Sequence, residues 1–192
     1  MTDHRVSQDF FESKYQADSD PWRFADSPYE RNRYAEIVNA LSGHRFHRAF
    51  EPGCSIGALT ELLAPVCDTV LAFDISPTAA ARAQARCARF PGVTVRVGSL
   101  PADIPDGRFD LIVFSEIGYY FDRTTLVSLV TNLLTRLQPG GTLLAAHWLG
   151  SSPDHILSGD DVHECLSKAL GPPPAETSQR FEGFRLDVWR RP

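Results

Sequence analysis

A glycine-rich turn near residue 50 has residue types that suit cofactor binding. It reads Glu51-Pro52-Gly53-Cys54-Ser55-Ile56-Gly57, between a short apolar run and a helix-like run. Glycines and backbone N–H groups at the start of a helix allow a ligand to lie against the main chain. The next apolar run ends at Asp74, where open parallel sheets hold ribose hydroxyls. The dinucleotide pattern G-x-G-x-x-G is not met, so the turn favours a cofactor with adenosine and no phosphate.

The same turn also matches G-x-S-x-G, the nucleophile elbow of α/β-hydrolases, with Ser55 as the nucleophile. That elbow follows an earlier strand whose loop supplies the oxyanion hole, whereas the segment before this turn is predicted to be mostly helical. His147, His155 and His163 follow downstream, but Asp74 is the one convincing acid at a strand end. A third interpretation is a glycine turn that only connects a strand to a helix.

Length and composition favour one domain over residues 1–192, because 43% hydrophobic content fills one core. No apolar run approaches 18 residues and no leader pattern opens the chain, so we expect a cytoplasmic protein without a membrane span. A net charge of −5 argues against a nucleic-acid partner. The cysteines lack metal-ligand or disulfide spacing and are expected to be reduced and buried, with no metal bound: Cys54, Cys67, Cys87 and Cys165.

Strand-like and helix-like runs alternate along the middle of the chain. Strands are predicted near residues 48–51, 69–73, 93–97, 109–115 and 142–147. Helices are predicted between them at about 57–64, 77–89 and 124–137, and Gln138-Pro139-Gly140-Gly141 is expected to close the last one. This alternation predicts an α/β fold with a doubly wound, mostly parallel sheet.

Both ends of the chain differ from this alternation. Residues 1–44 are predicted to form a helical cap, with a short helix at 8–16 and a second helix that runs to Leu41. Ser27-Pro28-x-Glu30 supplies an N-cap, a first-turn proline and a capping-box glutamate for the second helix. Near the C-terminus a helix is expected at 158–170. Prolines 172–174 then break the chain before a β-hairpin of residues 177–181 and 184–189.

Four segments together resemble the NodS-type family of class I S-adenosylmethionine-dependent methyltransferases. They are Asp20-Pro21-Trp22-Arg23, Pro28-Tyr29-Glu30-Arg31-x-Arg33-Tyr34, the turn from Glu51 to Thr60, and Ser115-Glu116-Ile117-Gly118-Tyr119-Tyr120. The resemblance covers roughly residues 8–148. It implies a Rossmann-like core over 45–192 with an antiparallel C-terminal hairpin. It departs from the wider class at Ser55, where glycine is common, and at Gly98-Ser99-Leu100, where an acid often follows the glycine.

The resemblance also implies the cofactor, S-adenosyl-L-methionine, and its contacts. The acid before the first glycine, Glu51, suits a sulfonium cation that carries an ammonium group. Asp74 is expected to hold the ribose, Ile75 to cover one face of the adenine, and Trp22 to form part of a lid. The full set of expected cofactor contacts is Trp22, Glu51, Gly53, Cys54, Gly57, Asp74, Ile75, Ser99, Leu100, Ser115 and Glu116.

The acceptor side is predicted from residues near the ends of later strands. His147 follows the fifth strand and is a candidate general base, the alternative being a histidine bonded to nearby backbone. His163 is a candidate for acceptor binding. Tyr119 and Tyr120 are expected to form the acceptor wall, with one of them in the core.

Tyr29 is the second candidate catalytic residue. It lies in the aromatic N-terminal segment, and its hydroxyl group or ring could contact the sulfonium, whereas Tyr34 is expected to serve packing.

The resemblance implies a small-molecule acceptor, because the family name comes from an enzyme that N-methylates the free amine of a deacetylated chitooligosaccharide. The turn that sandwiches a flipped base, an Asn or Asp followed by Pro-Pro and an aromatic residue, does not occur after the fourth strand. N-methylation of a small amino sugar or similar metabolite is therefore the leading prediction. The alternatives are O-methylation of a hydroxylated metabolite and a cofactor-binding protein without catalysis.

Overall fold

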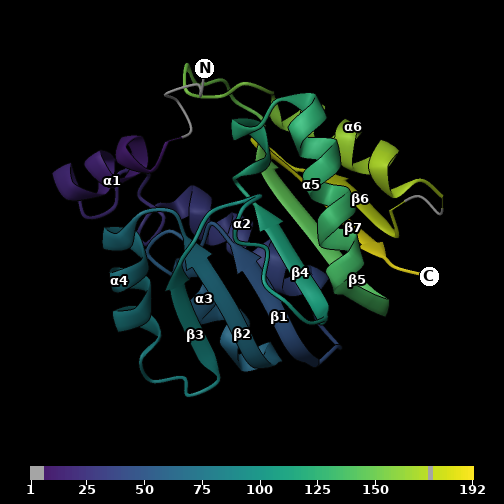
Figure 1. Ribbon diagram of the computed structural model, residues 1–192, viewed down its shortest axis with the longest axis horizontal. Coiled ribbons are helices and arrows are strands. Elements are labelled where there is room, and N and C mark those ends of the chain that lie inside the picture. Colours follow the sequence, from purple (N-terminus) through teal and green to yellow (C-terminus); the bar gives the residue numbers. More distant parts are fainter. Residues whose placement is uncertain (1–6, 173–174) are drawn as a thin grey trace. The chain divides into compact units, whose positions relative to one another are not determined.

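The computed structural model describes residues 7–172 and 175–192 (Figure 1). The first six residues of the predicted cap lie outside this range, as do Pro173 and Pro174 of the predicted proline break. The chain divides into two compact units, the first ending at Asp103 and the second beginning at Ile104. This division does not fall at the boundary expected between 44 and 45, and the single-domain organisation stays a prediction.

The first unit contains three parallel strands in the order β3-β2-β1, as predicted from their apolar runs. They are β1 (Phe46–Pro52), β2 (Cys67–Asp74) and β3 (Val93–Val97). Glu51 is in register with Ala72, and Asp74 with Val97. Because parallel strands end at the same edge of a sheet, the two acids that close β1 and β2 lie at one edge.

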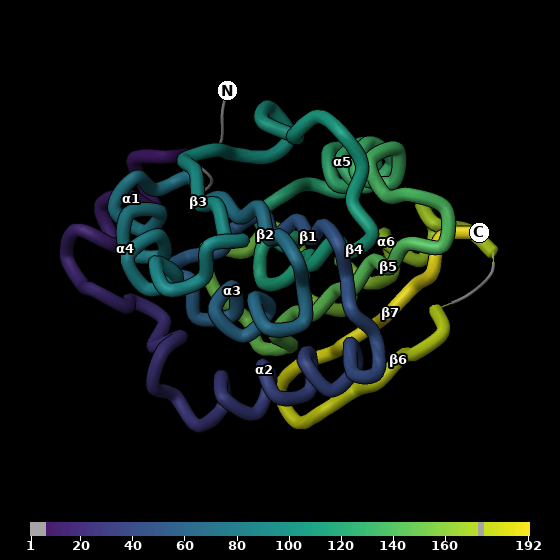
Figure 2. Tube along the Cα trace, turned by 90° about the horizontal axis from the view of Figure 1, so that it is seen from below, coloured from purple at the N-terminus to yellow at the C-terminus, as the bar shows by residue number. Residues whose placement is uncertain are grey.

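Five helical segments accompany these strands, and the two predicted N-terminal helices are confirmed. They are α1 (Gln8–Ala17), α2 (Pro28–Ala40), α3 (Ala58–Leu63), the 3-10 turn η2 (Ala64–Val66) and α4 (Pro77–Cys87). Helix α4 packs on β2 and β3, and α1 lies beside α4 in both views (Figures 1 and 2). The face of α4 is rich in buried alanines, which allow close approach of its neighbours.

The predicted capping box at the start of α2 is wrong. Ser27 is the N-cap and Pro28 begins the helix, but the Ser27 side chain makes no capping hydrogen bond. Glu30 instead forms a buried ion pair with Arg33, one turn along the helix. The buried Arg33 guanidinium offers this carboxylate a partner of opposite charge, so Glu30 pairs with Arg33.

The second unit contains four strands in the order β4-β5-β7-β6. Its elements are β4 (Phe109–Ser115), the 3-10 turn η3 (Gly118–Tyr120), α5 (Arg123–Arg136), β5 (Leu137–Trp148), α6 (Gly159–Leu170), β6 (Thr177–Arg180) and β7 (Phe184–Arg190). Strands β4 and β5 are parallel, whereas β7 is antiparallel to both β5 and β6. The predicted C-terminal hairpin is therefore confirmed.

The segment Gln138-Pro139-Gly140-Gly141 does not form the predicted break between a helix and a strand. Helix α5 ends at Arg136, and β5 begins at the next residue. The register of β4 against β5 skips from Leu137 to Thr142, so the four residues bulge out of the ladder. Gly140 has φ +74° and donates its N–H to the Arg191 carbonyl at 2.8 Å. The glycines therefore serve a bulge inside a strand.

The cysteines and the apolar character of the helices can be compared with what the composition predicts. All four cysteines are free and buried, as predicted. Within residues 7–172 and 175–192, no helix combines the length and the apolar character needed to cross a bilayer.

Candidate functional site

The glycine-rich turn of the first unit is held by its own backbone. The N–H groups of Gly53 and Cys54 both donate to the Phe73 carbonyl, at 2.8 and 2.9 Å. Gly57 has φ +78°, and a Cβ there would lie 2.9 Å from the Ala83 Cα atom of α4. These two N–H groups close the turn and precede the start of α3 at Ala58, where the sequence predicts that a ligand lies against the main chain. A phosphate would need such donors, whereas a cationic ligand does not.

Ser55 has the left-handed conformation, with φ +51°, and its side chain is buried. Its hydroxyl oxygen accepts a hydrogen bond from the Tyr15 hydroxyl of α1 at 2.5 Å. A nucleophilic serine is instead paired with a base. The contact joins α1 to the turn. No local pattern indicates it, because 40 residues separate the two side chains.

Asp74 lies at the carboxyl end of β2, where the sequence predicted a ribose contact. Its Oδ2 atom accepts the Ser55 N–H at 2.8 Å and its Oδ1 atom accepts the Ser76 N–H at 2.9 Å. Burial raises the pKa of this carboxyl to about 6, against backbone N–H groups, chiefly those of Ser76 and Ser55, that lower it. Each carboxylate oxygen has two lone pairs, so both can accept one further hydrogen bond. That capacity matches a ribose diol.

Glu51 lies at the end of β1 and is only 3% exposed. No described residue forms a hydrogen bond with its buried Oε2 atom. Burial raises the pKa of Glu51 to about 8, and the charge of Asp74 adds to the shift. A buried carboxyl with an unused oxygen is costly unless a cation or donor satisfies it. Glu51 therefore fits a ligand that carries an ammonium group.

The turn after β3 contains an acid that the sequence analysis missed. The Ser99 N–H donates to Asp103 Oδ2 at 2.8 Å, and the Asp103 N–H donates back to the Ser99 carbonyl at 2.8 Å. Asp103 thus stands four residues beyond the position where the wider class often has its acid. The Ser99 N–H is occupied by this contact, and the cofactor contacts expected of Ser99 and Leu100 stay predictions. Ile75 and Leu100 are half-buried apolar residues in the same unit.

Trp22 and Tyr29, the aromatic residues predicted to face the cofactor, have different surroundings in the first unit. Trp22 packs against the buried cluster of Tyr15, Ile56 and Ala79, so it covers part of the glycine-rich turn. Tyr29 is half-buried and its ring lies 6.0 Å from the Arg33 guanidinium. Tyr34 is buried, as expected of a packing residue. The catalytic role of Tyr29 stays a prediction.

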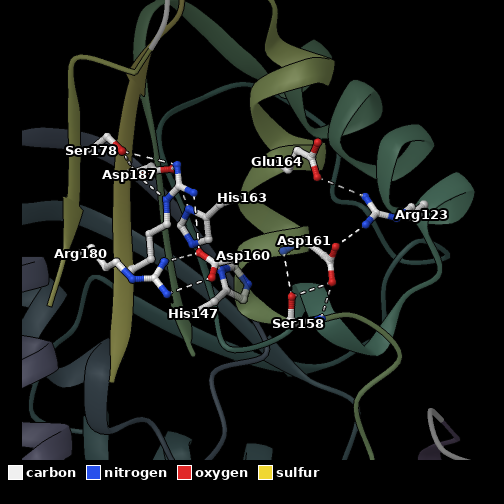
Figure 3. A network of polar contacts seen from close by, with 11 residues as sticks. Arg123, His147, Ser158, Asp160, Asp161, His163, Glu164, Ser178, Arg180 and Asp187 are labelled. Carbon is white, nitrogen blue, oxygen red and sulfur yellow. Dashed lines mark hydrogen bonds and ion pairs between the residues drawn. The ribbon is translucent and has the colours of Figure 1, made fainter. Parts of the chain in front are cut away.

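In the second unit, a buried relay of polar groups joins β7 to the turn after β4 (Figure 3). The Gly118 N–H points to His147 Nε2 at 3.1 Å, His147 Nδ1 lies 3.2 Å from His163 Nε2, and His163 Nδ1 lies 2.8 Å from Asp187 Oδ2. A backbone N–H can only donate, so His147 Nε2 accepts and its proton is on Nδ1. His163 in turn donates from Nδ1 to Asp187.

The relay buries His147, the predicted general base, and His163, the predicted acceptor-binding residue. His147 and His163 are both 0% exposed. His147 has the arrangement of the open alternative, a histidine bonded to nearby backbone. A Cβ at residue 118 would lie 2.4 Å from Val162 and 2.8 Å from His147, so only glycine fits there. The relay therefore positions the η3 turn, and the complete burial of His147 argues against its predicted role as general base.

The residues after β4 bring a carboxylate and aromatic rings together. Glu116 has φ +60°, and its carboxylate accepts the Trp148 N–H at 2.7 Å and the Tyr119 hydroxyl at 2.9 Å. Tyr119 is buried and Tyr120 is half-buried, so one of the two is in the core as predicted. The ring of His155, which the sequence analysis did not assign to the site, stacks on Tyr119. Ser115 is buried at the end of β4.

The sequence is similar to those of known proteins. The family model for nodulation protein S (NodS) matches residues 4–160. Nodulation protein S of Rhizobium tropici is 33% identical over 163 residues, which cover 80% of this chain and 67% of that protein. The protein of the same name from Bradyrhizobium diazoefficiens is 32% identical over 139 residues, or 71% of this chain and 65% of the relative. The chain thus spans about two thirds of the length of these curated relatives.

Solved structures give the same result for the fold. N-methyltransferase NodS from Bradyrhizobium japonicum, in complex with S-adenosyl-L-homocysteine, has a TM-score of 0.82 and 27% identity, and the match covers 97% of this chain and 99% of that one. A solved Pseudomonas syringae protein is 39% identical with a TM-score of 0.75, over 85% of this chain and 99% of that chain. The predicted class I methyltransferase fold is confirmed. The hydrolase alternative is set aside.

Proposed function

The chain belongs to the NodS family of S-adenosylmethionine-dependent methyltransferases, and from this premise we propose that it methylates the amine nitrogen of a small amino sugar or similar metabolite. The observation that carries the proposal is the family match over residues 4–160, together with a solved relative named an N-methyltransferase. The cofactor supplies an electrophilic methyl group on a sulfonium. An amine nitrogen needs only a free lone pair to accept it.

The residues that we propose for the donor lie in the first unit. Glu51 has an unused buried oxygen for the ammonium of the cofactor, and Asp74 has the capacity to accept from both ribose hydroxyls. Ile75 follows Asp74 as a half-buried apolar residue and is proposed to cover the adenine. Together they offer an acceptor for the ammonium group, acceptors for the ribose diol and an apolar surface for the adenine of this cofactor.

The acceptor is tested with pairs of sugars that differ only at the nitrogen. We expect methyl transfer from labelled cofactor to glucosamine and to a chitooligosaccharide with one free amine. The N-acetylated counterparts keep every hydroxyl group but lose the basic nitrogen, so we expect no transfer to them. Mass spectrometry and NMR of the product identify the methylated atom. Transfer to the hydroxyl oxygens of both members of a pair would contradict N-methylation and favour the O-methylation alternative.

Glu51 leads to a prediction about protons. With a pKa of about 8 the free protein holds a protonated Glu51 at pH 7, and a bound ammonium favours the ionised form. We expect binding of S-adenosylhomocysteine at pH 7 to release close to one proton. Below about pH 8 the affinity should rise roughly tenfold per pH unit. Calorimetry in buffers of different ionisation enthalpy measures the proton directly.

The matched variants for this prediction are Glu51→Gln and Glu61→Gln, which remove one carboxylate each. Glu61 lies in α3 and pairs with Arg86 and Arg89. Only Glu51→Gln should abolish the proton release and flatten the affinity between about pH 6.5 and 8. Equal proton release in both variants would show that Glu51 does not face the ammonium.

A further inference from the structure

We propose that His155 is the catalytic residue that takes the proton from the ammonium group of the acceptor, beside an aromatic wall of Tyr119, Tyr120 and Trp148. The inference rests on the proposed function, because only an amine acceptor brings a proton that must leave before attack. The general base is then not His147, which is completely buried, but a histidine in the loop between β5 and α6.

The ring of His155 is held by aromatic contacts from three other residues. It stacks on Tyr119 with centroids 3.7 Å apart and an interplanar angle of 15°. Its edge contacts are with Tyr120 at 5.3 Å and Trp148 at 6.0 Å. The Ile156 and Leu157 N–H groups donate to the Tyr119 carbonyl, at 2.8 and 3.1 Å. The loop and the η3 turn therefore form one surface.

Contacts with other residues of the second unit hold Tyr119 and Trp148 of this wall in place. Tyr119 donates its hydroxyl to Glu116, and its ring contacts His147 of the buried relay at 5.5 Å. A Cβ at residue 150 would lie 1.9 Å from the Trp148 ring, so the indole packs on a bare glycine backbone. Tyr119 is buried and stacked on His155, so the half-buried rings of Tyr120 and Trp148 are the aromatic faces that can attract an ammonium group. This surface therefore suits a cationic amine on a sugar ring.

The imidazole of His155 has the chemistry of a base. It is half-exposed, and no described residue forms a hydrogen bond with its buried Nδ1 atom. Burial lowers the pKa of His155, although the charges of Glu116 and Asp154 oppose the shift. The other titratable groups that face it are the phenols of Tyr119 and Tyr120. The ring is thus neutral near pH 7 and keeps a lone pair, while nearby carboxylates stabilise the imidazolium once it forms.

The proposed step is a proton transfer. An N–H bond of the acceptor ammonium breaks and leaves its electron pair on the nitrogen. A new N–H bond forms on Nε2 of His155, because Nδ1 is buried, so a neutral imidazole and an ammonium become an imidazolium and a free amine. The imidazolium later gives its proton to water. A general base of this kind typically contributes roughly 10²- to 10⁴-fold to the rate.

The test uses His155→Phe, which keeps an aromatic ring on Tyr119 but has no nitrogen, and His44→Phe, which removes an exposed histidine of the first unit. With glucosamine at pH 7 we expect kcat of His155→Phe to fall roughly 10²-fold or more. The loss should shrink as pH rises and the amine deprotonates in solution. KM and the unfolding temperature should stay close to wild type, and His44→Phe should behave as wild type throughout.

A second measurement is independent of turnover. In NMR spectra of the ring protons, the signal missing from His155→Phe should titrate below the ordinary histidine pKa and should shift when glucosamine is added without cofactor. Wild-type kcat and pH dependence in His155→Phe, on an amine that the wild type methylates, would overturn this inference alone. Methylation of hydroxyl oxygens only by the wild type would instead overturn the proposed function, and His155 as base with it.

Discussion

Replacement of Asp74 by alanine is expected to weaken binding of S-adenosylhomocysteine by at least a hundredfold. Two hydrogen bonds from ribose hydroxyls to a buried carboxylate contribute about 1.5 to 3 kcal/mol each, and every 1.4 kcal/mol is about tenfold in affinity. The same carboxylate accepts the Ser55 and Ser76 N–H groups, so its loss also loosens the glycine-rich turn. Calorimetric titration of the purified protein measures the affinity.

Two further variants separate cofactor binding from folding. Asp74→Asn keeps one acceptor oxygen and the side-chain volume, so we expect a smaller loss of affinity and little change in unfolding temperature. Asp68→Asn removes an exposed acid at the opposite end of β2 and serves as the control for net charge. An Asp74→Ala protein that unfolds as wild type and binds with unchanged affinity would mean that the ribose is held elsewhere.

The sequence was most informative where local chemistry and periodicity agreed. Apolar runs of β-branched and aromatic residues predicted β3 and β4 to the residue. Strand β4 is buried, which leaves little choice of side chain, whereas β3 is mostly exposed and was recognised by its β-branched residues. The glycine turn and Asp74 were found for the same reason, since a close approach to α4 demands Gly57. The bulge at 138–141 was missed because its cause is pairing with the C-terminal residue Arg191, which no local pattern records.

Burial and the partners of individual side chains account for most of the remaining differences. Glu30 matched a capping box, but burial beside Arg33 gave it a stronger partner. His147 was predicted from its place at a strand end, which gives the backbone position without the contacts of the ring. His155 sits in a loop with no periodicity, and its stack on Tyr119 spans 36 positions. Spacing predicts elements well, whereas the environment of a histidine depends on tertiary packing.

Removal of Asp187 is expected to be among the most destabilising single changes in the second unit. Asp187 is 1% exposed and accepts from His163, from Ser178 at 2.7 Å and from Arg185 at 3.2 Å. In Asp187→Ala these donors lose their charged acceptor and are left unsatisfied, which costs about 3 to 5 kcal/mol in total. At about 2 to 4 °C per kcal/mol for a chain of this size, the unfolding temperature should fall by roughly 6 to 20 °C.

The control for Asp187→Ala is an exposed acid near it. Asp160 pairs with Arg180 at the surface (Figure 3). Asp160→Ala should cost no more than about 1 kcal/mol. Burial would raise the pKa of Asp187, but the hydrogen bonds from His163, Ser178 and Arg185 hold it below its usual value. A lowered folded-state pKa stabilises the protein above the unfolded-state pKa of about 3.9, and this contribution is lost as pH falls through the folded value. The gap in stability between wild type and Asp187→Ala should therefore be constant near neutral pH and narrow in acid. A gap that does not change with pH would mean that the relay acts through packing and not through the charge of Asp187.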